Sequence, residues 1–261
     1  MVDIYENAEE AARMAGEALL VRFRDHIHVE NKYDGSPVTQ ADIESNEIIS
    51  QCLARTKIPV VSEEAFVSVH SKKKYWLIDP LDGTKEFISG NSEFTINIAL
   101  IQGNLPVAGV VYAPALGEMY VGGKKESPRL IINGSEKEIE SSACVDQIRI
   151  LVSRHHNTTD LDLFVRQNNI QKVTSMGSSL KYCRIAAGEA EFSPRLVGSS
   201  EWDTAAAQVI LEGAGGGMIN WHTKRRLTYG KKNWRNPRFL AFRYPLNPNQ
   251  FTLREYKEEL L

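Results

Sequence analysis

Cysteine is scarce in this sequence: Cys52, Cys144 and Cys183 lie far apart and show no CxxC spacing. An odd number of distant cysteines excludes a small disulfide-stapled scaffold and indicates reduced thiols. No run of apolar residues reaches the roughly 18 residues of a membrane-spanning helix. Residues 1–6 have neither a basic start nor an apolar run, so we expect no secretory signal. We expect a cytoplasmic protein without an integral membrane segment, either free or held peripherally on the inner face of the membrane.

A large excess of one charge is also absent. The sequence has 31 Lys and Arg against 33 Asp and Glu, for a net charge of −2. This balance argues against a general nucleic-acid-binding protein, so we expect no nucleic acid among its partners. The 261 residues are 42% hydrophobic and contain no internal repeat or low-complexity tract. They suffice for one large domain or two small ones that share a core.

Hydrophobic spacing predicts helices and strands in both halves of the chain. In the first half we expect helices over residues 3–24 and 40–53, the second burying Ile43, Ile48, Ile49 and Cys52. Short strands are predicted at residues 59–62, 75–78, 95–101 and 107–112. In the second half we expect a strand at 148–152 and helices at 161–167, 178–187 and 203–212. The glycine run at 213–217 lacks GxGxxG spacing and is predicted to end the last helix.

The hydrophobic pattern weakens around residues 124–128, where we place a domain boundary. We expect residues 1–125 to form an N-terminal α+β half that holds metal and phosphate. Residues 126–261 would form a C-terminal α/β half that contributes substrate specificity and one metal ligand. Strands and helices mixed in both halves predict an α/β protein overall.

The segment Asp79-Pro80-Leu81-Asp82-Gly83-Thr84 is the strongest chemical signal in the sequence. A buried strand delivers Asp79 to its carboxyl end, and Gly83 permits a tight turn there. Two carboxylates three residues apart, with the Leu81 carbonyl between them, can converge on a hard cation such as Mg²⁺. The backbone amides of Gly83 and Thr84, at the start of a helix, are suited to hold phosphate oxygens.

A simple capped turn explains the same segment equally well, with Asp79 and Asp82 as Asx-turn or N-cap residues. Asp203 and Asp42 also stand at predicted helix starts, where an N-cap is the simpler explanation for each alone. Glu63 follows a strand and can aim an acid at the same point. An aspartate-nucleophile phosphatase of the haloacid type is a further alternative, but its D-x-D-x-T motif is missing from the sequence.

Taken together, several ordered segments resemble one superfamily across nearly the whole chain. The matching segments are residues 38–42, 62–64, 76–87 and 202–206. They resemble the lithium-sensitive, Mg²⁺-dependent sugar phosphatases, which include inositol monophosphatases and fructose-1,6-bisphosphatases. The resemblance implies a layered αβαβα fold and hydrolysis of a phosphate monoester.

Within that superfamily, the chain is similar to the 3′(2′),5′-bisphosphate nucleotidases of the CysQ type. The segments that carry this closer likeness are residues 83–88, 91–100, 177–183, 194–195, 227–232 and 236–237. These enzymes remove the 3′-phosphate of adenosine 3′,5′-bisphosphate, a by-product of sulfate activation. The resemblance implies a small phosphorylated nucleotide as the partner and leaves open whether the protein is a monomer or a homodimer.

The resemblance also implies a role for each matching residue. Two or three Mg²⁺ ions would be bound by the Leu81 carbonyl and by the carboxylates of Glu63, Asp79, Asp82 and Asp203. Asp42 and Thr84 resemble the pair that orients and deprotonates the attacking water, and Glu63 joins them in the catalytic set.

Substrate contacts are implied for a second, overlapping set of residues. Gly83 and Thr84 would hold the scissile phosphate, and Ser178, Lys181 and Arg195 match positions near the second phosphate. His156 matches a substrate-facing histidine. The metal-binding residues Glu63, Leu81, Asp82 and Asp203 would also border the substrate. The family's usual Tyr-Pro-Arg is Ser193-Pro194-Arg195 here, which retains the arginine.

Two other functions compete with a bisphosphate nucleotidase. An inositol-1-phosphate phosphatase, or one acting on a related sugar phosphate, shares the fold and the metal ligands. It has no use for cations near a second phosphate, because the inositol ring is neutral. A non-catalytic sensor of metal or nucleotide is the other alternative, although every proposed ligand and Thr84 are retained.

Overall fold

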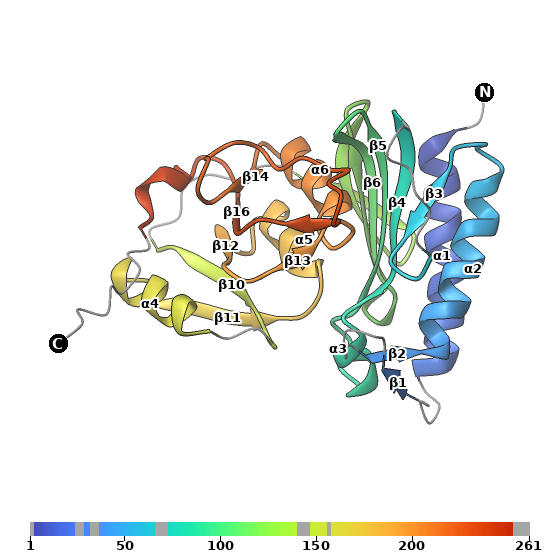
Figure 1. Cartoon of the computed structure of the whole chain (residues 1–261), viewed down its shortest axis with the longest axis horizontal. Helices are drawn as coiled ribbons and strands as arrows, with labels where there is room; N and C mark the ends of the chain where they lie inside the picture. Colours follow the sequence, from blue (N-terminus) through green and yellow to red (C-terminus); the bar gives the residue numbers. More distant parts are fainter. Residues whose placement is uncertain are drawn as a thin grey trace.

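The computed structural model describes residues 3–23, 29–31, 37–65, 73–139, 147–155 and 158–252, with the backbone alone for 29–31, 37 and 38. In this part of the chain, two large β-sheets alternate with three layers of helices (Figure 1). Helices α1 (Ile4–Phe23) and α2 (Gln40–Ala54) form one outer layer. The order of layers is therefore αβαβα, as the sequence predicts.

The larger sheet has seven strands, which pair in chain order. They are β3 (Val60–Ser62), β4 (Lys74–Asp82), β5 (Thr95–Gln102), β6 (Leu105–Ala113), β7 (Glu118–Gly123), β8 (Glu126–Ile132) and β9 (Ser135–Glu138). The β3–β4 pair is parallel and the other pairs are antiparallel. Three short elements complete this half: the ribbon of β1 (Val29–Asn31) and β2 (Pro37–Thr39), helix α3 (Thr84–Ile88) and the 3₁₀ turn η1 (Pro114–Leu116).

Strand β4 is apolar along most of its length because both of its faces are covered. Trp76 and Ile78 belong to the cluster beneath α1 and α2. Tyr75 and Leu77 belong to the cluster on the opposite face of the sheet. Alternating side chains of one strand thus enter two cores, which explains the unbroken apolar run before Asp79.

The smaller sheet has the strand order β11-β10-β12-β16-β14. Its strands are β10 (Arg149–Ser153), β11 (Lys172–Met176), β12 (Phe192–Arg195), β14 (Gly217–Asn220) and β16 (Phe239–Phe242). Helices α5 (Leu180–Ala186) and α6 (Ala205–Gly213) fill the layer between the two sheets, and α4 (Thr159–Gln167) covers the outer face of the smaller one (Figure 1). A ribbon of β13 (Ser199–Ser200) and β15 (Arg235–Asn236) and the turn η2 (Pro248–Gln250) complete the chain.

Helix α6 packs tightly on the larger sheet although it comes late in the chain. A Cβ atom added at Gly109 of β6 would lie 2.5 Å from the Ala206 carbonyl oxygen and 2.7 Å from Cγ1 of Val209. Only glycine permits this approach of helix to strand. The contact brings the residues just before α6 to the edge of the larger sheet.

Most predicted elements are confirmed with small shifts at their ends. The prediction that Ile43 is buried is wrong: its side chain is 41% exposed, because the buried face of α2 follows Ile49, Cys52 and Leu53 instead. Strand β4 also runs further than predicted, through Asp79 to Asp82. The glycine run ends α6 as expected, with Gly215 at φ +83°. The expected boundary after residue 125 falls between β7 and β8, and the division into two halves stays a prediction.

Two further expectations concern thiols and membranes. Cys52 and Cys183 are buried free thiols, and Cys144 lies outside the described residues. Over the ranges described above, no helix combines the length and the apolar character needed to span a bilayer.

Candidate functional site

A cavity of about 760 Å³ is lined by residues from both sheets and from the helix layer between them. The sheets and helices contribute through the loops after β3, β4, β10 and β11 and the segment before α6. Its residues include most of the sequence-predicted site: Glu63, Asp79, Leu81, Asp82, Gly83, Thr84, Ser178, Lys181, Arg195 and Asp203. The structure thus brings together residues that are more than a hundred positions apart in the sequence.

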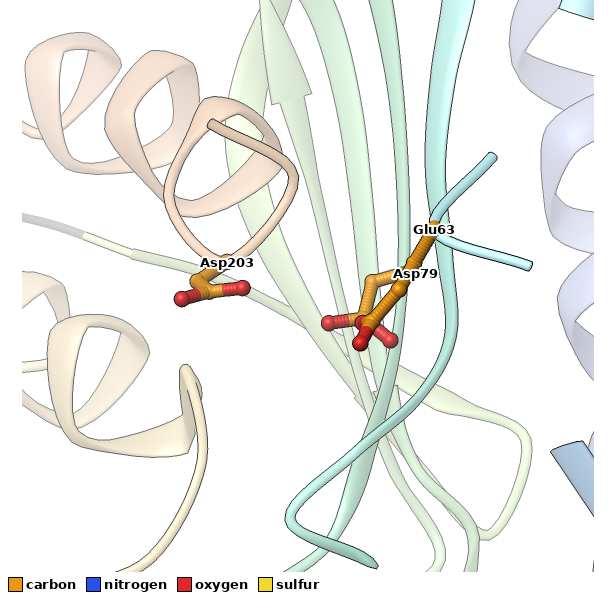
Figure 2. Close-up of side chains that lie close together, drawn as sticks. All are labelled: Glu63, Asp79 and Asp203. Atoms are coloured by element: carbon orange, nitrogen blue, oxygen red, sulfur yellow. The ribbon is translucent and has the colours of Figure 1, made fainter. Parts of the chain in front are cut away.

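Three carboxylates converge in this cavity, with Asp203 reaching in from the turn before α6 and Glu63 and Asp79 from the side of the larger sheet (Figure 2). One oxygen from each of Glu63, Asp79 and Asp203 lies within 4.8 Å of the others. Burial, together with the charges of Asp82 and Glu63, raises the pKa of Asp203 to about 7. Such crowding of negative charge is unfavourable unless a cation or protons offset it. Three convergent carboxylates are the donor set that a hard divalent cation prefers.

A bulge in β4 explains how Asp79 and Asp82 both reach the cavity. Asp79 pairs with Asn97 and Asp82 with Thr95, so the register shifts between these pairs. In a regular strand, residues three apart would face opposite sides of the sheet. The extra residue in the bulge removes that alternation. The Leu81 amide donates to Asp79 Oδ1 at 3.1 Å, which is the Asx turn that the capped-turn interpretation predicts.

Asp82 lies outside the close carboxylate trio but lines the same cavity. Its Oδ2 accepts hydrogen bonds from the Ser179 amide at 2.5 Å and from Asn97 Nδ2 at 3.2 Å. Helix α3 has Gly83 at its N-cap, with φ +89° and no side-chain cap, so Asp82 is not a helix cap. Its carboxylate is instead oriented by a residue of the other half of the chain.

Asp42 both caps helix α2 and lies close to Thr84. Its Oδ2 accepts from the Thr39 amide and from Thr39 Oγ1, both at 2.8 Å, in a capping box at the start of α2. Its Oδ1 lies 3.4 Å from Thr84 Oγ1. The Thr84 hydroxyl also lies 3.3 Å from the Leu81 carbonyl oxygen. The predicted Asp42–Thr84 pair is therefore close in space.

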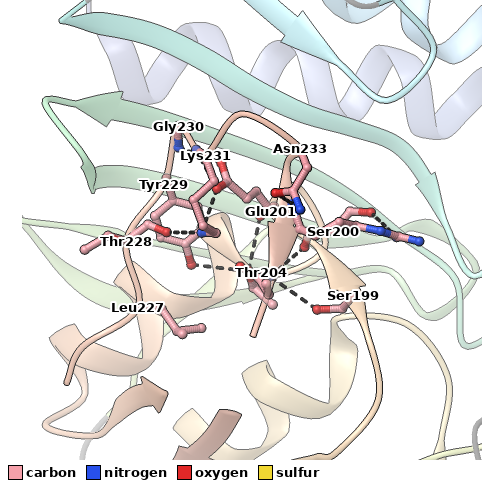
Figure 3. A network of polar contacts seen from close by, with 12 residues as sticks. Ser199, Ser200, Glu201, Thr204, Leu227, Thr228, Tyr229, Gly230, Lys231 and Asn233 are labelled. Carbon is pink, nitrogen blue, oxygen red and sulfur yellow. Dashed lines mark hydrogen bonds and ion pairs between the residues drawn. The ribbon is translucent and has the colours of Figure 1, made fainter. Parts of the chain in front are cut away.

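Asp203 is not an N-cap, because that position of α6 is Thr204, which makes no side-chain cap. Asp203 Oδ2 instead accepts from the Ser200 amide at 2.8 Å. The neighbouring Glu201 is fully buried and accepts from the amide of Lys231 at 3.0 Å and from its Nζ at 2.6 Å (Figure 3). Thr204 Oγ1 donates to the Glu201 carbonyl at 3.2 Å. This buried network fixes the turn that presents Asp203.

Another part of the cavity lining, the basic wall, carries positive charge. Lys181 is buried, which lowers its pKa to about 8, and its Nζ donates to the Ser178 carbonyl. Arg195 Nη1 donates to Ser153 Oγ at 2.5 Å, and its Nη2 to the Gly198 carbonyl at 3.1 Å. The buried Nε of Arg195 has no hydrogen-bond partner within the described ranges. These groups offer hydrogen-bond donors to an anion in the cavity.

His156, the predicted substrate-facing histidine, lies outside the described residues. Its neighbour His155 lines the cavity and lies 3.3 Å from Glu86, measured between Nε2 and Oε1. Sequence reasoning assigned no role to Ser179, Asn97 or Glu93, which bind groups at the cavity edge. All three lie in segments with a family likeness, but their pairing across the two halves is visible only in space.

Comparisons with known proteins agree over most of the chain. The sequence model described as the inositol monophosphatase family matches residues 1–252. The 3′(2′),5′-bisphosphate nucleotidase CysQ of Salmonella typhimurium is 39% identical over 241 residues, covering 90% of this chain and 97% of that protein. The CysQ protein of Escherichia coli K12 is 37% identical over 235 residues, covering 87% and 95%.

Solved structures show the same likeness. CysQ from Bacteroides thetaiotaomicron superimposes with a TM-score of 0.82 at 32% identity, over 92% of this chain and 96% of that one. The inositol monophosphatase of Thermotoga maritima superimposes with a TM-score of 0.75 at 23% identity, over 89% of each chain. The second comparison supports the fold alone.

Proposed function

This chain belongs to the inositol monophosphatase family, and from that membership we propose that it is a Mg²⁺-dependent 3′(2′),5′-bisphosphate nucleotidase. It would hydrolyse the 3′-phosphate of adenosine 3′,5′-bisphosphate to give AMP and inorganic phosphate. The observation that carries the choice of substrate is that carboxylates and cationic side chains line the same cavity. The acidic wall gathers carboxylates and the basic wall presents Ser178, Lys181 and Arg195.

The carboxylate trio and the nearby oxygens fit Mg²⁺. Glu63, Asp79, Asp82 and Asp203 would hold two or three ions together with the Leu81 carbonyl. Mg²⁺, when bound, supplies Lewis-acid charge beside the scissile phosphate, which phosphate-monoester hydrolysis requires because its uncatalysed rate is so slow. A cation bound here would offset the burial and the neighbouring negative charges that together raise the pKa of Asp203.

The chain's own residues can carry the proton of the attacking water. Thr84 Oγ1 lies within reach of Asp42 Oδ1, so Thr84 can accept a proton from water while its own proton passes to Asp42. Glu63 borders the same space and completes the catalytic set. The water oxygen forms the new bond to phosphorus as the bond to the 3′ oxygen breaks. The leaving 3′ oxygen takes a proton from solvent water, and Asp42 returns the proton it received to solvent. The amides of Gly83 and Thr84 are suited to hold the phosphate oxygens during this exchange.

The second phosphate of the nucleotide would occupy the positively charged wall. Burial of Lys181 lowers its pKa to about 8, and an anion beside it would favour its charged form. Arg195 is held in place by Ser153 and Gly198, so its guanidinium is ordered before substrate binds. Pre-ordered charged donors recognise a phosphate without a large entropic cost. A nucleotide by-product of sulfate activation implies a cytoplasmic location, which belongs to the same proposal.

Phosphate release tests this function directly. We expect Mg²⁺-dependent release from adenosine 3′,5′-bisphosphate at a higher kcat/KM than from inositol 1-phosphate, with inhibition of both by added Li⁺. Preference for the inositol ester would instead assign the chain to sugar-phosphate hydrolysis. Absence of turnover with either ester would favour a metal or nucleotide sensor.

A further inference from the structure

Glu93 ties the two halves of the molecule together beside the cavity. It lies between α3 and β5, in the half that carries most of the carboxylates. Its Oε2 accepts from Arg154 Nη2 at 2.6 Å and from the Gly177 amide at 2.7 Å. Arg154 follows β10 and Gly177 follows β11, so both donors stand at the ends of strands in the smaller sheet. One carboxylate oxygen thus connects two neighbouring strand ends to the larger sheet's half.

The two partners of Glu93 are directly connected to the positively charged wall. Gly177 precedes Ser178, whose carbonyl accepts from Lys181 Nζ. Ser153 precedes Arg154 and accepts from Arg195 at 2.5 Å. Each of the three residues proposed for the second phosphate is therefore linked to a partner of Glu93. A shift of Arg154 and Gly177 would move that wall as a unit.

The turn over residues 177–179 also contacts Asp82 and residues near it. Ser179 donates its amide to Asp82 at 2.5 Å, and its hydroxyl bonds to Asn97 at 2.6 Å. A Cβ added at Gly83 would lie 3.3 Å from Ser178 Cβ, and one added at Gly177 would lie 2.6 Å from Glu86 Cγ. The turn over residues 177–179 is thus bonded on both sides of Ser178, by Glu93 at one end and by Asp82 at the other.

Glu93 does not itself line the cavity, whereas Arg154 and Gly177 do. A carboxylate in direct contact with a phosphate would repel it, so a role as a substrate ligand is excluded by charge as well as by place. The hydrogen bond from Arg154 to Glu93 raises the pKa of that guanidinium, as expected for a stable ion pair. The pair is partly exposed, with side-chain exposures of 35% and 23% for Arg154 and Glu93.

We propose that Glu93 is a positioning residue that sets the distance between the scissile-phosphate site and the second-phosphate site. This inference rests on the proposed nucleotidase function, because it assumes that the substrate spans both walls. Glu93 acts through Arg154 and Gly177, which hold Ser178, Lys181 and Arg195 in register with the carboxylates. Loss of the Glu93 hydrogen bonds would weaken the binding of a two-phosphate substrate. It would leave unchanged the binding of a substrate that uses the acidic wall alone.

A pair of nucleotides that differ by one phosphate tests this role. Adenosine 3′,5′-bisphosphate spans both walls, whereas adenosine 3′-monophosphate lacks the second anion. For Glu93→Gln we expect KM for the bisphosphate to rise about 10-fold, as for the loss of one hydrogen bond to a charged group. The kcat for both nucleotides and the KM for the monophosphate should stay within about twofold of wild type, because the acidic wall keeps its own contacts.

Glu191→Gln is the matched control. Glu191 also accepts from a backbone amide and a guanidinium, both of Arg149, at 2.7 Å, but all within the smaller sheet's half. It should leave the ratio of the two KM values unchanged. If Glu93→Gln fails to fold, Arg154→Lys replaces it, with a smaller rise in KM for the bisphosphate alone.

The possible outcomes separate the two proposals. If Glu93→Gln loses activity equally on both nucleotides, or changes on neither, the positioning role is wrong. The nucleotidase function still stands in that case if the wild-type enzyme prefers the bisphosphate. A wild-type enzyme that does not distinguish the two nucleotides would overturn recognition of the second phosphate, and the positioning role with it.

Discussion

The two walls of the cavity are built in different ways. The acidic wall (Glu63, Asp79, Asp82 and Asp203) takes Asp79 and Asp82 from β4 and Glu63 from just after β3, in a sheet that is buried on both faces. The basic wall (Ser178, Lys181 and Arg195) is held by hydrogen bonds between turns and strand ends. A rigid frame suits a metal-dependent reaction, which requires exact ligand geometry. The substrate-selecting groups instead lie on a turn, on α5 and at the end of β12, so each can be substituted without replacing a carboxylate.

Breaking the acidic wall should have the largest effect. Asp79→Asn removes one charge from the carboxylate trio but keeps an acceptor for the Leu81 amide, so we expect the fold to persist. Its kcat/KM should fall by about 100-fold or more, since even outer partners of metal ligands cost about 10–100-fold. Phosphate release at saturating Mg²⁺ and circular dichroism measure the two effects.

Asp160→Asn is a suitable control for this substitution. Asp160 forms an ion pair with Arg238 at 2.7 Å, and neither residue lines the cavity. Exposed pairs of this kind contribute only about 0–1 kcal/mol. Wild-type turnover by Asp79→Asn would show that the carboxylate trio is not the metal site.

Removing the Thr84 hydroxyl should have the next largest effect. Thr84→Val keeps the shape of the side chain but cannot relay a proton to Asp42. We expect kcat to fall by about 10²–10⁴-fold, the usual contribution of general acid–base catalysis. Thr84→Ser restores the hydroxyl and should recover most of the rate. Equal rates for the valine and serine variants would contradict a proton-transfer role.

Neutralising the basic wall should affect substrate choice more than turnover. Lys181→Met removes a buried charge at nearly constant volume. We expect kcat/KM for adenosine 3′,5′-bisphosphate to fall about 10-fold or more, with a much smaller change for adenosine 3′-monophosphate. Stability to urea should stay the same or rise, because a buried charge is costly to desolvate. Parallel losses on both nucleotides would place Lys181 in the structural frame instead.

The packing of α6 on β6 can be weakened without replacing a cavity-lining residue. Gly109→Ala introduces a Cβ within 2.5 Å of the Ala206 carbonyl, so β6 and α6 must separate slightly. Overpacking of this kind costs about 1–3 kcal/mol, measurable by urea denaturation. Gly198→Ala, whose added Cβ meets nothing within 4 Å, should change stability by less than about 0.5 kcal/mol. Equal stabilities of the two variants would contradict the close contact.

The sequence predicts the acidic wall well because local patterns encode most of it. An unbroken apolar run leading into Asp79 indicates a strand buried on both faces, and the turn that follows brings a second acid near the first. The bulge that aligns Asp79 with Asp82 leaves no local signal, since it depends on pairing with β5. The sequence does not predict the exposure of Ile43, because the spacing of apolar residues within α2 does not show how much of the helix surface the sheet covers.

The links between the walls are harder to predict from the sequence. Glu93 and Gly177 are 84 positions apart, and neither residue type at its own position indicates a partner. Asp42 illustrates the same limit, because a capping box accounts fully for its local segment and its contact with Thr84 comes from tertiary packing. Family likeness marks these segments as important but does not state which residue binds which.

The place of α6 has a consequence for the newly made chain. Asp203 lies just before a helix that packs on β6, so the carboxylate trio needs a segment made long after Glu63 and Asp79. Ribosomes add roughly 5–20 residues per second, and N-terminal parts fold first. The larger sheet can therefore form on the ribosome while the trio is still incomplete. Metal binding through all three carboxylates must wait for the later helix, so a truncated product from the first half alone would lack the complete site.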